Sequence, residues 1–180
     1  MVKYITTERL SLTILKVEDH VFLHELVNTK GWLQFIGDRN IHSEEDAISY
    51  INKINSMQDT WYWVVRLTDT HVSIGIVTFI KRTYLEHFDI GFAFLPGYNG
   101  KGYAYEAVKA ILSIISSKPE HSIVLATVLP DNVNSIKLLT KLGLHFNNEI
   151  EIDGEELHIY SSVLPEPSPT VHHTNLQNKG

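Results

Sequence analysis

The chain contains no cysteine among its 180 residues. This absence excludes disulfides, cysteine-based zinc sites and a cysteine nucleophile, so direct transfer is the simplest route for any acyl chemistry. No apolar run approaches the roughly 18 residues that indicate a membrane-spanning helix. The opening residues Met1 to Tyr4 are followed by polar residues, which argues against a signal peptide and predicts a cytoplasmic protein.

Positive charge is also scarce, with 15 lysines and arginines against 21 acidic residues and a net charge of −6. This balance disfavours nucleic acid as a partner and mildly favours a cationic one, such as an amine or a basic peptide. The ten histidines are scattered and form no His-x-x-x-His pattern. We therefore expect no metal site.

Hydrophobic residues make up 43% of the chain, including three Trp, seven Phe and eight Tyr. A chain of this length and composition predicts one domain that buries about 70% of its unfolded surface. We place that domain at residues 1–163. Residues 164–180 are rich in proline, serine, histidine and asparagine without periodicity, which predicts a disordered C-terminal tail.

The order of hydrophobic patterns predicts a mixed α/β sheet. The run from Ile123 to Leu129 is apolar on both faces, so that strand is expected to be covered on both sides. Asp153-Gly154 predicts a two-residue hairpin turn. Strands are expected over 10–15, 61–67, 73–81, 88–95, 122–129, 146–152 and 155–162, helices over 17–27, 43–56, 104–115 and 132–142, and an irregular segment over 29–40.

A glycine-rich loop joins the strand at 88–95 to the helix that follows it. It reads Gly97-Tyr98-Asn99-Gly100-Lys101-Gly102-Tyr103-Ala104. Its glycines let the backbone approach a ligand closely, and the next helix points unpaired N–H groups and its positive dipole end at the loop. This combination predicts a phosphate site. The same octet is also compatible with an ordinary strand-to-helix turn.

Two common nucleotide motifs do not fit this loop. A dinucleotide fingerprint requires a third glycine where Tyr105 stands, and a P-loop requires Lys-Ser or Lys-Thr after its last glycine. A second segment follows about thirty residues later, from Asp131 to Gly143. It has a polar residue at the expected helix start, an apolar stripe and a glycine at the expected helix end. An ordinary surface helix has the same features.

Together these segments resemble the GNAT acyltransferases. The first follows the pyrophosphate loop Gln/Arg-x-x-Gly-x-Gly/Ala through Gly100, Lys101, Gly102, Tyr103 and Ala104, with Asn99 as an unusual first residue. The second resembles Asn-x-x-Ser…Leu-x-x-Lys-x-Gly-Phe through Asn132, Ser135, Leu138, Lys141 and Gly143, with Leu144 in place of the phenylalanine.

The opening Thr7-Glu8-Arg9-Leu10 is similar to one branch of that family, which acetylates the N-termini of ribosomal proteins (RimJ/RimL-like). Arg9 and Glu8 are alternatively solvated charges beside a first strand. The likeness covers residues 5–162.

The resemblance implies a mostly antiparallel twisted sheet flanked by helices, in which two parallel strands, 88–95 and 122–129, splay apart. The pantetheine arm of acetyl-CoA would lie between them, paired with backbone groups of Ala93 and Phe94 as in strand addition. Asn132 would hold the arm from the other side. The backbone N–H near Phe94 would bond the thioester oxygen.

The resemblance also implies catalytic roles. Asp89 matches an acid that relatives carry just ahead of the loop, and it is the expected general base if it faces inward. Many relatives place a tyrosine acid where this chain has Leu139. Ser135 is the candidate for that contact, with helix capping as its alternative role.

By the same resemblance the acceptor would lie against Trp32, Phe35 and Tyr62, although such aromatic residues also form protein cores. A weak base suits an α-amine, which is about a tenth neutral at pH 7, better than a lysine. The sequence therefore favours an N-acetyltransferase acting on a protein N-terminus.

Three other functions remain compatible with the sequence: a small-molecule amine acetyltransferase, a non-catalytic acetyl-CoA-binding module, and an unrelated nucleotide-binding domain. The expected protein is a monomer or a homodimer.

Overall fold

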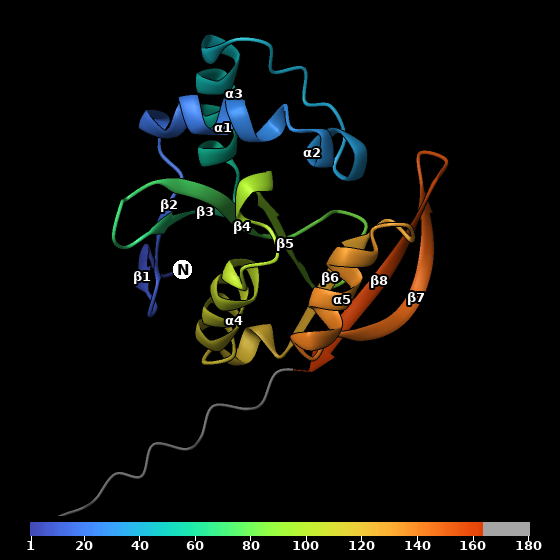
Figure 1. The fold of residues 1–180 in the computed structure, drawn as a ribbon. Coiled ribbons are helices and arrows are strands. Elements are labelled where there is room, and N and C mark those ends of the chain that lie inside the picture. Colours follow the sequence, from blue (N-terminus) through green and yellow to red (C-terminus); the bar gives the residue numbers. More distant parts are fainter. Residues whose placement is uncertain (164–180) are drawn as a thin grey trace, which may run out of the picture.

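A computed structural model shows one eight-stranded sheet in the order β1-β2-β3-β4-β5-β6-β8-β7 (Figure 1). The structure describes residues 1–163, so the tail predicted at 164–180 lies outside the described residues. The strands are β1 (Tyr4–Thr6), β2 (Leu10–Ile14), β3 (Thr60–Leu67), β4 (Ser73–Ile80), β5 (Phe88–Phe94), β6 (Ile123–Val128), β7 (His145–Ile152) and β8 (Glu155–Val163).

Neighbouring strands pair antiparallel, except β5 and β6, which are parallel. The predicted hairpin of β7 and β8 lies at one end of the sheet, and Asp153 adopts the positive φ of 53° that a tight turn requires. The mixed, mostly antiparallel sheet with one parallel pair confirms the predicted fold class.

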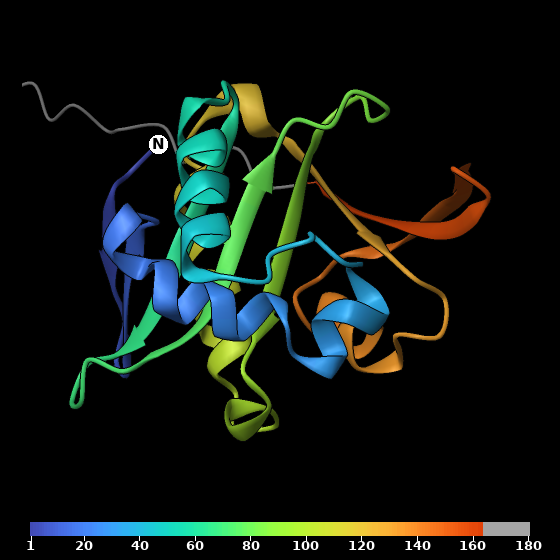
Figure 2. The ribbon, with the colours of Figure 1, turned by 90° about the horizontal axis from the view of Figure 1, so that it is seen from above.

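Helices cover both faces of the sheet (Figures 1 and 2). We call the two sides the α1–α3 face and the α4–α5 face. A capping box formed by Ser43 and Asp46 starts α3, as the acidic first turn predicts. The helices are α1 (His20–Val27), α2 (Lys30–Phe35), α3 (Glu44–Ser56), α4 (Tyr103–Ile115) and α5 (Val133–Lys141).

Two hydrophobic cores lie on opposite sides of the central strands. On the α4–α5 face, Val108 and Ile111 of α4 pack against Trp63 and Phe79 of the sheet. On the α1–α3 face, Ile51 of α3 belongs to the same buried cluster as Val64 of β3. The alternation of side chains along β3 and β5 therefore assigns each residue to one face.

Two elements differ from the sequence-based expectation. The segment 29–40 was expected to be irregular, but Lys30–Phe35 forms the short helix α2 because the side chain of Thr29 accepts a hydrogen bond from the Trp32 N–H. The short edge strand β1 was also missed. With only Tyr4–Thr6, it presents too few residues for an alternating pattern.

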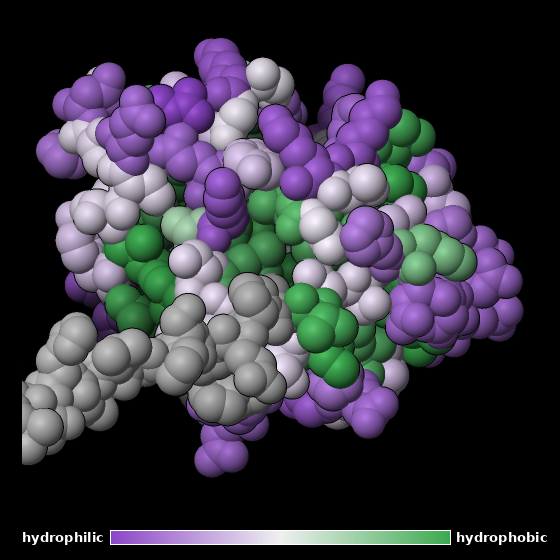
Figure 3. Space-filling model, turned by 90° about the horizontal axis from the view of Figure 1, so that it is seen from below, coloured by the Kyte–Doolittle hydropathy of each residue, from purple (hydrophilic) through white to green (hydrophobic). Residues whose placement is uncertain are grey.

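The face seen in Figure 3 carries both polar and apolar residues. Seen from below Figure 1, hydrophobic residues gather near the middle of the visible face with polar ones around them (Figure 3). Within residues 1–163, no helix is long and apolar enough to cross a membrane.

Candidate functional site

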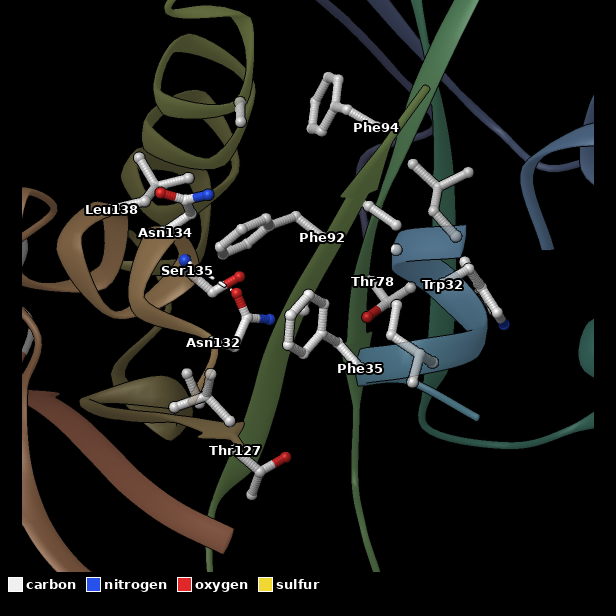
Figure 4. A pocket seen from close by; sticks show the side chains of 18 of the residues that line it. Trp32, Phe35, Thr78, Phe92, Phe94, Thr127, Asn132, Asn134, Ser135 and Leu138 are labelled. Atoms are coloured by element: carbon white, nitrogen blue, oxygen red, sulfur yellow. Dashed lines mark hydrogen bonds between the residues drawn. The ribbon is translucent and has the colours of Figure 1, made fainter. Parts of the chain in front are cut away.

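The parallel strands β5 and β6 stay paired over only two positions. Phe88 pairs with Val124 and Asp89 with Leu125, after which no further pairing occurs. The separation opens a cleft of about 1190 Å³ that is lined from both faces of the sheet (Figure 4). Irregular or unpaired backbone of this kind leaves N–H and C=O groups available to a ligand.

Asp89 lies at the point where the strands separate. Its side chain is 3% exposed, and Oδ1 accepts hydrogen bonds from Thr127 N (2.9 Å) and Thr127 Oγ1 (3.2 Å). Oδ2 accepts from Nε of Arg82 at 2.9 Å. The carboxylate thus satisfies a β6 N–H that the sheet no longer pairs. These bonds favour a positioning role over the general base expected from the sequence.

The free edge of β5 follows from its pairing with β4. Leu95 N donates to Ile74 O at 2.9 Å, and hydrogen-bonded positions alternate in an antiparallel pair. Ala93 therefore directs its backbone groups to β4, whereas Phe92 and Phe94 direct theirs to the cleft. The register thus gives Phe94 backbone groups that face the cleft, as expected, and places those of Phe92 there in place of Ala93's.

The glycine loop has the backbone that the sequence suggested. Gly100 and Gly102 have φ values of 74° and 82°, and Gly102 is the N-cap of α4. Glu106 N donates to Gly102 O at 3.0 Å, so the earlier N–H groups of Tyr103, Ala104 and Tyr105 have no partner within the helix. Together with the helix dipole, these N–H groups create an end of α4 that favours negative charge. Asn99 and Lys101 flank it, both exposed.

Arg9 clamps this loop from the N-terminal segment. Its Nε donates to Glu106 Oε2 at 2.7 Å, and its NH1 donates to Lys101 O at 3.1 Å. The guanidinium also lies 4.6 Å from the centroid of the Tyr103 ring. Arg9 is therefore exposed to solvent but also fixed by contacts to the glycine loop and to α4. No signal in the sequence pointed to this contact, which spans more than ninety residues.

Glu106 is the centre of the clamp. Its Oε1 also accepts from Thr7 Oγ1 (2.6 Å) and Arg9 N (2.9 Å). Partial burial opposes its charge, but these hydrogen bonds and Arg9 lower the pKa of Glu106. The carboxylate stays ionised near neutral pH and fixes the first turn of α4 to the N-terminal segment.

The second motif places Asn132 and Ser135 on the cleft wall. Asn132 Oδ1 caps α5 by accepting from Ser135 N at 3.2 Å. Figure 4 shows the Asn132 amide nitrogen directed toward β5, so this donor remains available. Ser135 lines the cleft as well. Leu139 is 2% exposed and belongs to the core. Its aliphatic side chain cannot supply the hydroxyl that a tyrosine would bring to this position.

The predicted acceptor residues lie on the α1–α3 side of the cleft. Phe35 projects from α2 toward the cleft (Figure 4), and Tyr62 lines it from β3. Burial, with Tyr50 beside it, raises the pKa of Tyr62, so its hydroxyl stays neutral. Trp32 lines the cleft but is 5% exposed and belongs to the core beneath α1–α3. Its role is therefore at least partly structural.

Several residues that line the cleft, among them Thr78, Arg82 and Arg39, were not predicted from the sequence. Thr78 on β4 faces Gly91 on β5, where an added Cβ would lie 2.7 Å from Thr78 Oγ1. Arg82 and Arg39 add positive charge to the same side. Only the tertiary fold brings these residues together, so no local motif could identify them.

A possible metal-binding cluster lies elsewhere. Within residues 1–163, Glu149, Glu156 and His158 could offer ligand atoms within 4.8 Å of one another. Glu149 and Glu156 are exposed, and none of the three lines the cleft. Exposed acidic groups of this kind are common without a metal.

Comparison with known proteins agrees with this geometry. Residues 9–145 match the family model described as the acetyltransferase (GNAT) domain. The chain is 30% identical over 141 residues to the uncharacterized N-acetyltransferase YnaD of Bacillus subtilis (strain 168), covering 78% of this chain and 82% of that protein.

Solved structures show the same fold. A GNAT-family acetyltransferase from Bacillus anthracis superimposes with a TM-score of 0.75 at 25% identity, covering 89% of this chain and 98% of that one. RimL, a ribosomal L7/L12 α-N-protein acetyltransferase in complex with coenzyme A, gives a TM-score of 0.78 at 14% identity, covering 90% and 98%.

Proposed function

This chain belongs to the GNAT acetyltransferase family, and from that premise we propose that it transfers an acetyl group from acetyl-CoA directly to the N-terminal α-amine of a protein. The observation that carries the proposal is the cleft between β5 and β6, which is lined by the N-terminal end of α4 and by side chains of the α1–α3 face. A donor and an acceptor can therefore meet from opposite sides of one sheet.

The residues on the α4–α5 face fit acetyl-CoA. The N–H groups of Tyr103, Ala104 and Tyr105 would hold the pyrophosphate, with Gly100 and Gly102 allowing its close approach. Backbone groups of Phe92 and Phe94 would pair with the pantetheine arm, and the Asn132 amide would bind it from α5. When bound, acetyl-CoA supplies an activated acetyl thioester.

Lysines near this end add favourable charge. Lys101 Nζ lies 5.5 Å from the Tyr98 ring centroid, and Lys141 Nζ lies 4.6 Å from that of Tyr105. Both are cations next to an expected polyphosphate, which they would attract over a short, salt-screened range.

We expect two groups of the chain to act on the reaction itself. The Phe94 N–H, which faces the cleft, would stabilise negative charge on the carbonyl oxygen. The Ser135 hydroxyl would contact the departing sulfur, whose thiol pKa near 8.5 makes strong acid assistance unnecessary. Because the chain has no cysteine, the acetyl group passes to the amine without a cysteine-bound intermediate.

The amine requires little help to lose its proton if it is an α-amine. Asp89, the base expected from the sequence, is occupied by Arg82 and Thr127. An α-amine with a pKa near 8 is about a tenth neutral at pH 7, whereas a lysine amine is below a thousandth neutral. This difference favours a protein N-terminus over an internal lysine.

The RimJ/RimL-like branch is supported by the Thr7-Glu8-Arg9-Leu10 opening, whose Arg9 holds the loop. Similar folds also include a ribosomal-protein-S5-alanine acetyltransferase of Vibrio fischeri at 20% identity. At this identity the likeness concerns the fold, so the acceptor class depends on experiment.

A small-molecule amine is the second candidate. The observation that favours it is the open acceptor side of the cleft, and a spermidine N-acetyltransferase chimera shares the fold at 18% identity and a TM-score of 0.72. A non-catalytic acetyl-CoA sensor would bind the cosubstrate and release no thiol with any amine.

Thiol release from acetyl-CoA tests the proposal. The acceptors are lysine-containing peptides with a free N-terminus, the same peptides with an acetylated N-terminus, and spermidine. The acetylated peptides offer only the lysine amine. We expect release with free N-termini only. Release with spermidine alone would support the small-molecule function and contradict the protein N-terminus.

A further inference from the structure

Two arginines line the acceptor side of the cleft. Arg82 follows β4, and Arg39 lies in the segment between α2 and α3. In a cleft expected to receive an amine, which is largely cationic in water, arginines are an unexpected choice because like charges repel. Their presence therefore requires a ligand group of opposite charge or an internal partner.

The internal partner of Arg82 uses only part of its guanidinium. Nε donates to Asp89 Oδ2 at 2.9 Å, and no other described residue accepts a hydrogen bond from Arg82. The Arg82 side chain is 33% exposed. Burial opposes its charge, but Asp89 raises the pKa of Arg82. Asp89 thus orients a permanently charged fork whose terminal N–H groups are available to a ligand.

Arg39 has no hydrogen bond or ion pair with a side chain in the described part of the chain. Its loop is nevertheless anchored, because Asn28 Nδ2 donates to Ile41 O at 2.9 Å and Asp38 Oδ1 accepts from Asn40 N at 2.7 Å. The residue is exposed and lines the cleft. The fold therefore presents a second cation at the cleft, and this one has no anionic partner among the described residues.

Hydroxyl groups accompany the arginines. Tyr50, Tyr62 and Tyr84 line the same part of the cleft, and a neutral tyrosine can donate a hydrogen bond to an anion. The pKa of Tyr62 is raised by burial, and Arg82 and Arg39 both act on it electrostatically. Guanidinium and phenol donors are the groups expected around a carboxylate or phosphate.

Among the carboxylates that line the cleft, Asp89 pairs with Arg82 and leaves Arg39 without an anionic partner in the described residues. The oxygens of Asp89 are taken by Arg82 and Thr127. Asp153 and Glu155 line the cleft from the β7–β8 hairpin, and they are exposed as Arg39 is, so water screens all three charges. A polyamine would find no free buried carboxylate among the described residues that line the cleft.

We infer that the acceptor carries an anionic group, a carboxylate or a phosphate, close to its amine, and that Arg82 and Arg39 bind this group. The inference rests on the proposed acetyl transfer and specifies its substrate class. On a protein N-terminus, an acidic side chain or a phosphorylated residue near the first position would supply the anion. The arginines thereby select the acceptor and orient its amine.

Matched acceptors test this selectivity. The tripeptide amides Ala-Asp-Ala, Ala-Asn-Ala and Ala-Lys-Ala differ in one side-chain charge, and phosphoethanolamine is paired with ethanolamine. We expect kcat/KM to be about tenfold or more higher for the anionic member of at least one set, as a charge-assisted hydrogen bond implies. The tripeptides test for recognition of a carboxylate, and the phosphoethanolamine–ethanolamine pair tests for recognition of a phosphate.

Variants connect the effect to the residues. Arg39→Gln and Arg82→Gln should each reduce the anionic-to-neutral ratio of kcat/KM toward one, and Arg39→Lys should retain part of it. Lys53→Gln is the control, because Lys53 is an exposed cation of α3 that does not line the cleft. It should keep the wild-type ratio. A ratio near one in the wild type, or preference for Ala-Lys-Ala or spermidine, would overturn the inference.

A binding measurement separates this inference from the proposed function. The denaturation midpoint of the coenzyme A-saturated protein is measured with phosphoethanolamine, ethanolamine, Ala-Asp-Ala and Ala-Asn-Ala. A rise confined to anionic ligands, and lost in Arg39→Gln, would support the anion site even if no amine is acetylated. Turnover of neutral amines with no anionic preference in rate or binding would retain the transferase and reject the anion site.

Discussion

The two sides of the cleft are built in different ways. The α4–α5 side consists largely of backbone: two glycines with positive φ, the first turn of α4 and the free edge of β5. The α1–α3 side consists of side chains from separate segments, including Phe35, Tyr62 and Arg82. A backbone site suits an invariant cosubstrate, whereas a side-chain wall can change its chemistry without altering the fold. We therefore propose that the first side binds the cosubstrate and that the second selects the acceptor.

The largest expected effect comes from filling the backbone site. Gly102→Trp places a bulky side chain at φ 82°, where an added Cβ already lies 3.4 Å from Arg9 NH2. We expect coenzyme A affinity to fall by more than about 100-fold, which corresponds to about 2.7 kcal/mol. Isothermal titration with coenzyme A measures it.

Gly97→Trp is the matched control for this change. Gly97 belongs to the same loop sequence, but it has open space around its Cβ position and does not line the cleft. It should keep wild-type affinity. Equal losses in both variants would show that the loop tolerates no bulk anywhere and would remove the assignment of Gly102.

A change at the fork of β5 and β6 should affect the acceptor side alone. Asp89→Asn keeps an oxygen for Thr127 but loses the charge that orients Arg82. We expect kcat/KM for the acceptor to fall about tenfold with coenzyme A affinity unchanged, since a charged hydrogen bond contributes about 1.5–3 kcal/mol.

The pH dependence of the same variant distinguishes positioning from proton transfer. If Asp89 positions Arg82, the acidic limb of the pH–rate profile keeps its place in Asp89→Asn. If Asp89 is the general base that the sequence suggested, the variant loses that limb. Steady-state rates from pH 5 to pH 9 decide between the two roles.

Removing the Arg9 clamp should weaken coenzyme A binding by a smaller factor. Arg9→Ala removes two contacts to Glu106 and one to Lys101; the backbone bond to Glu106 remains possible. Because Arg9 is 43% exposed, water replaces part of the lost energy. We expect coenzyme A to bind about fivefold more weakly, within the range of a single hydrogen bond.

Glu8→Gln is the control for the clamp. Glu8 lies in the same N-terminal motif and is exposed. Its substitution should leave coenzyme A affinity unchanged. If Arg9→Ala behaves like Glu8→Gln, the clamp contributes nothing to cosubstrate binding.

The smallest effect is expected outside both sides of the cleft. His121 is 8% exposed, packs against Phe79 and Phe88, and its Nδ1 has no hydrogen-bond partner in the described residues. Burial lowers the pKa of His121 below its usual 6.5. Below about pH 6.5 the unfolded chain binds the proton first, so stability falls as the pH falls.

His121→Phe should reduce this loss without altering either ligand site. Urea unfolding at pH 7.5 and at pH 5.5 measures the free energy of unfolding in both proteins. The difference between the two pH values should be smaller in the variant. An equal difference would show that other groups determine the acid sensitivity.

The contrast between the two sides also explains what the sequence could predict. The positive-φ glycines Gly100 and Gly102 and the helix cap Asn132 could be predicted because a backbone site leaves a local pattern: glycines at turns and a cap at a helix start. The sheet followed from alternating strands and turn residues. Ala93 was selected instead of Phe92 because a run apolar on both faces does not reveal which backbone edge is free.

The acceptor side left no such pattern. Arg39, Thr78 and Arg82 come from different segments and acquire a common role only through the fold. Arg9 was likewise ambiguous until the structure placed it against Glu106. The prediction of a cationic partner came from the net charge of −6. That charge is a property of the whole chain and does not describe the cleft.

The central claim is that the α4–α5 side is a coenzyme A site. The most direct test is the heat-denaturation midpoint with acetyl-CoA, coenzyme A, ATP or NAD, each in excess. Stabilisation confined to the two coenzyme A species is predicted, because a ligand at about 100 times its Kd adds about 2.7 kcal/mol to the folded state. No rise with either of them, or an equal rise with ATP or NAD, would contradict the claim.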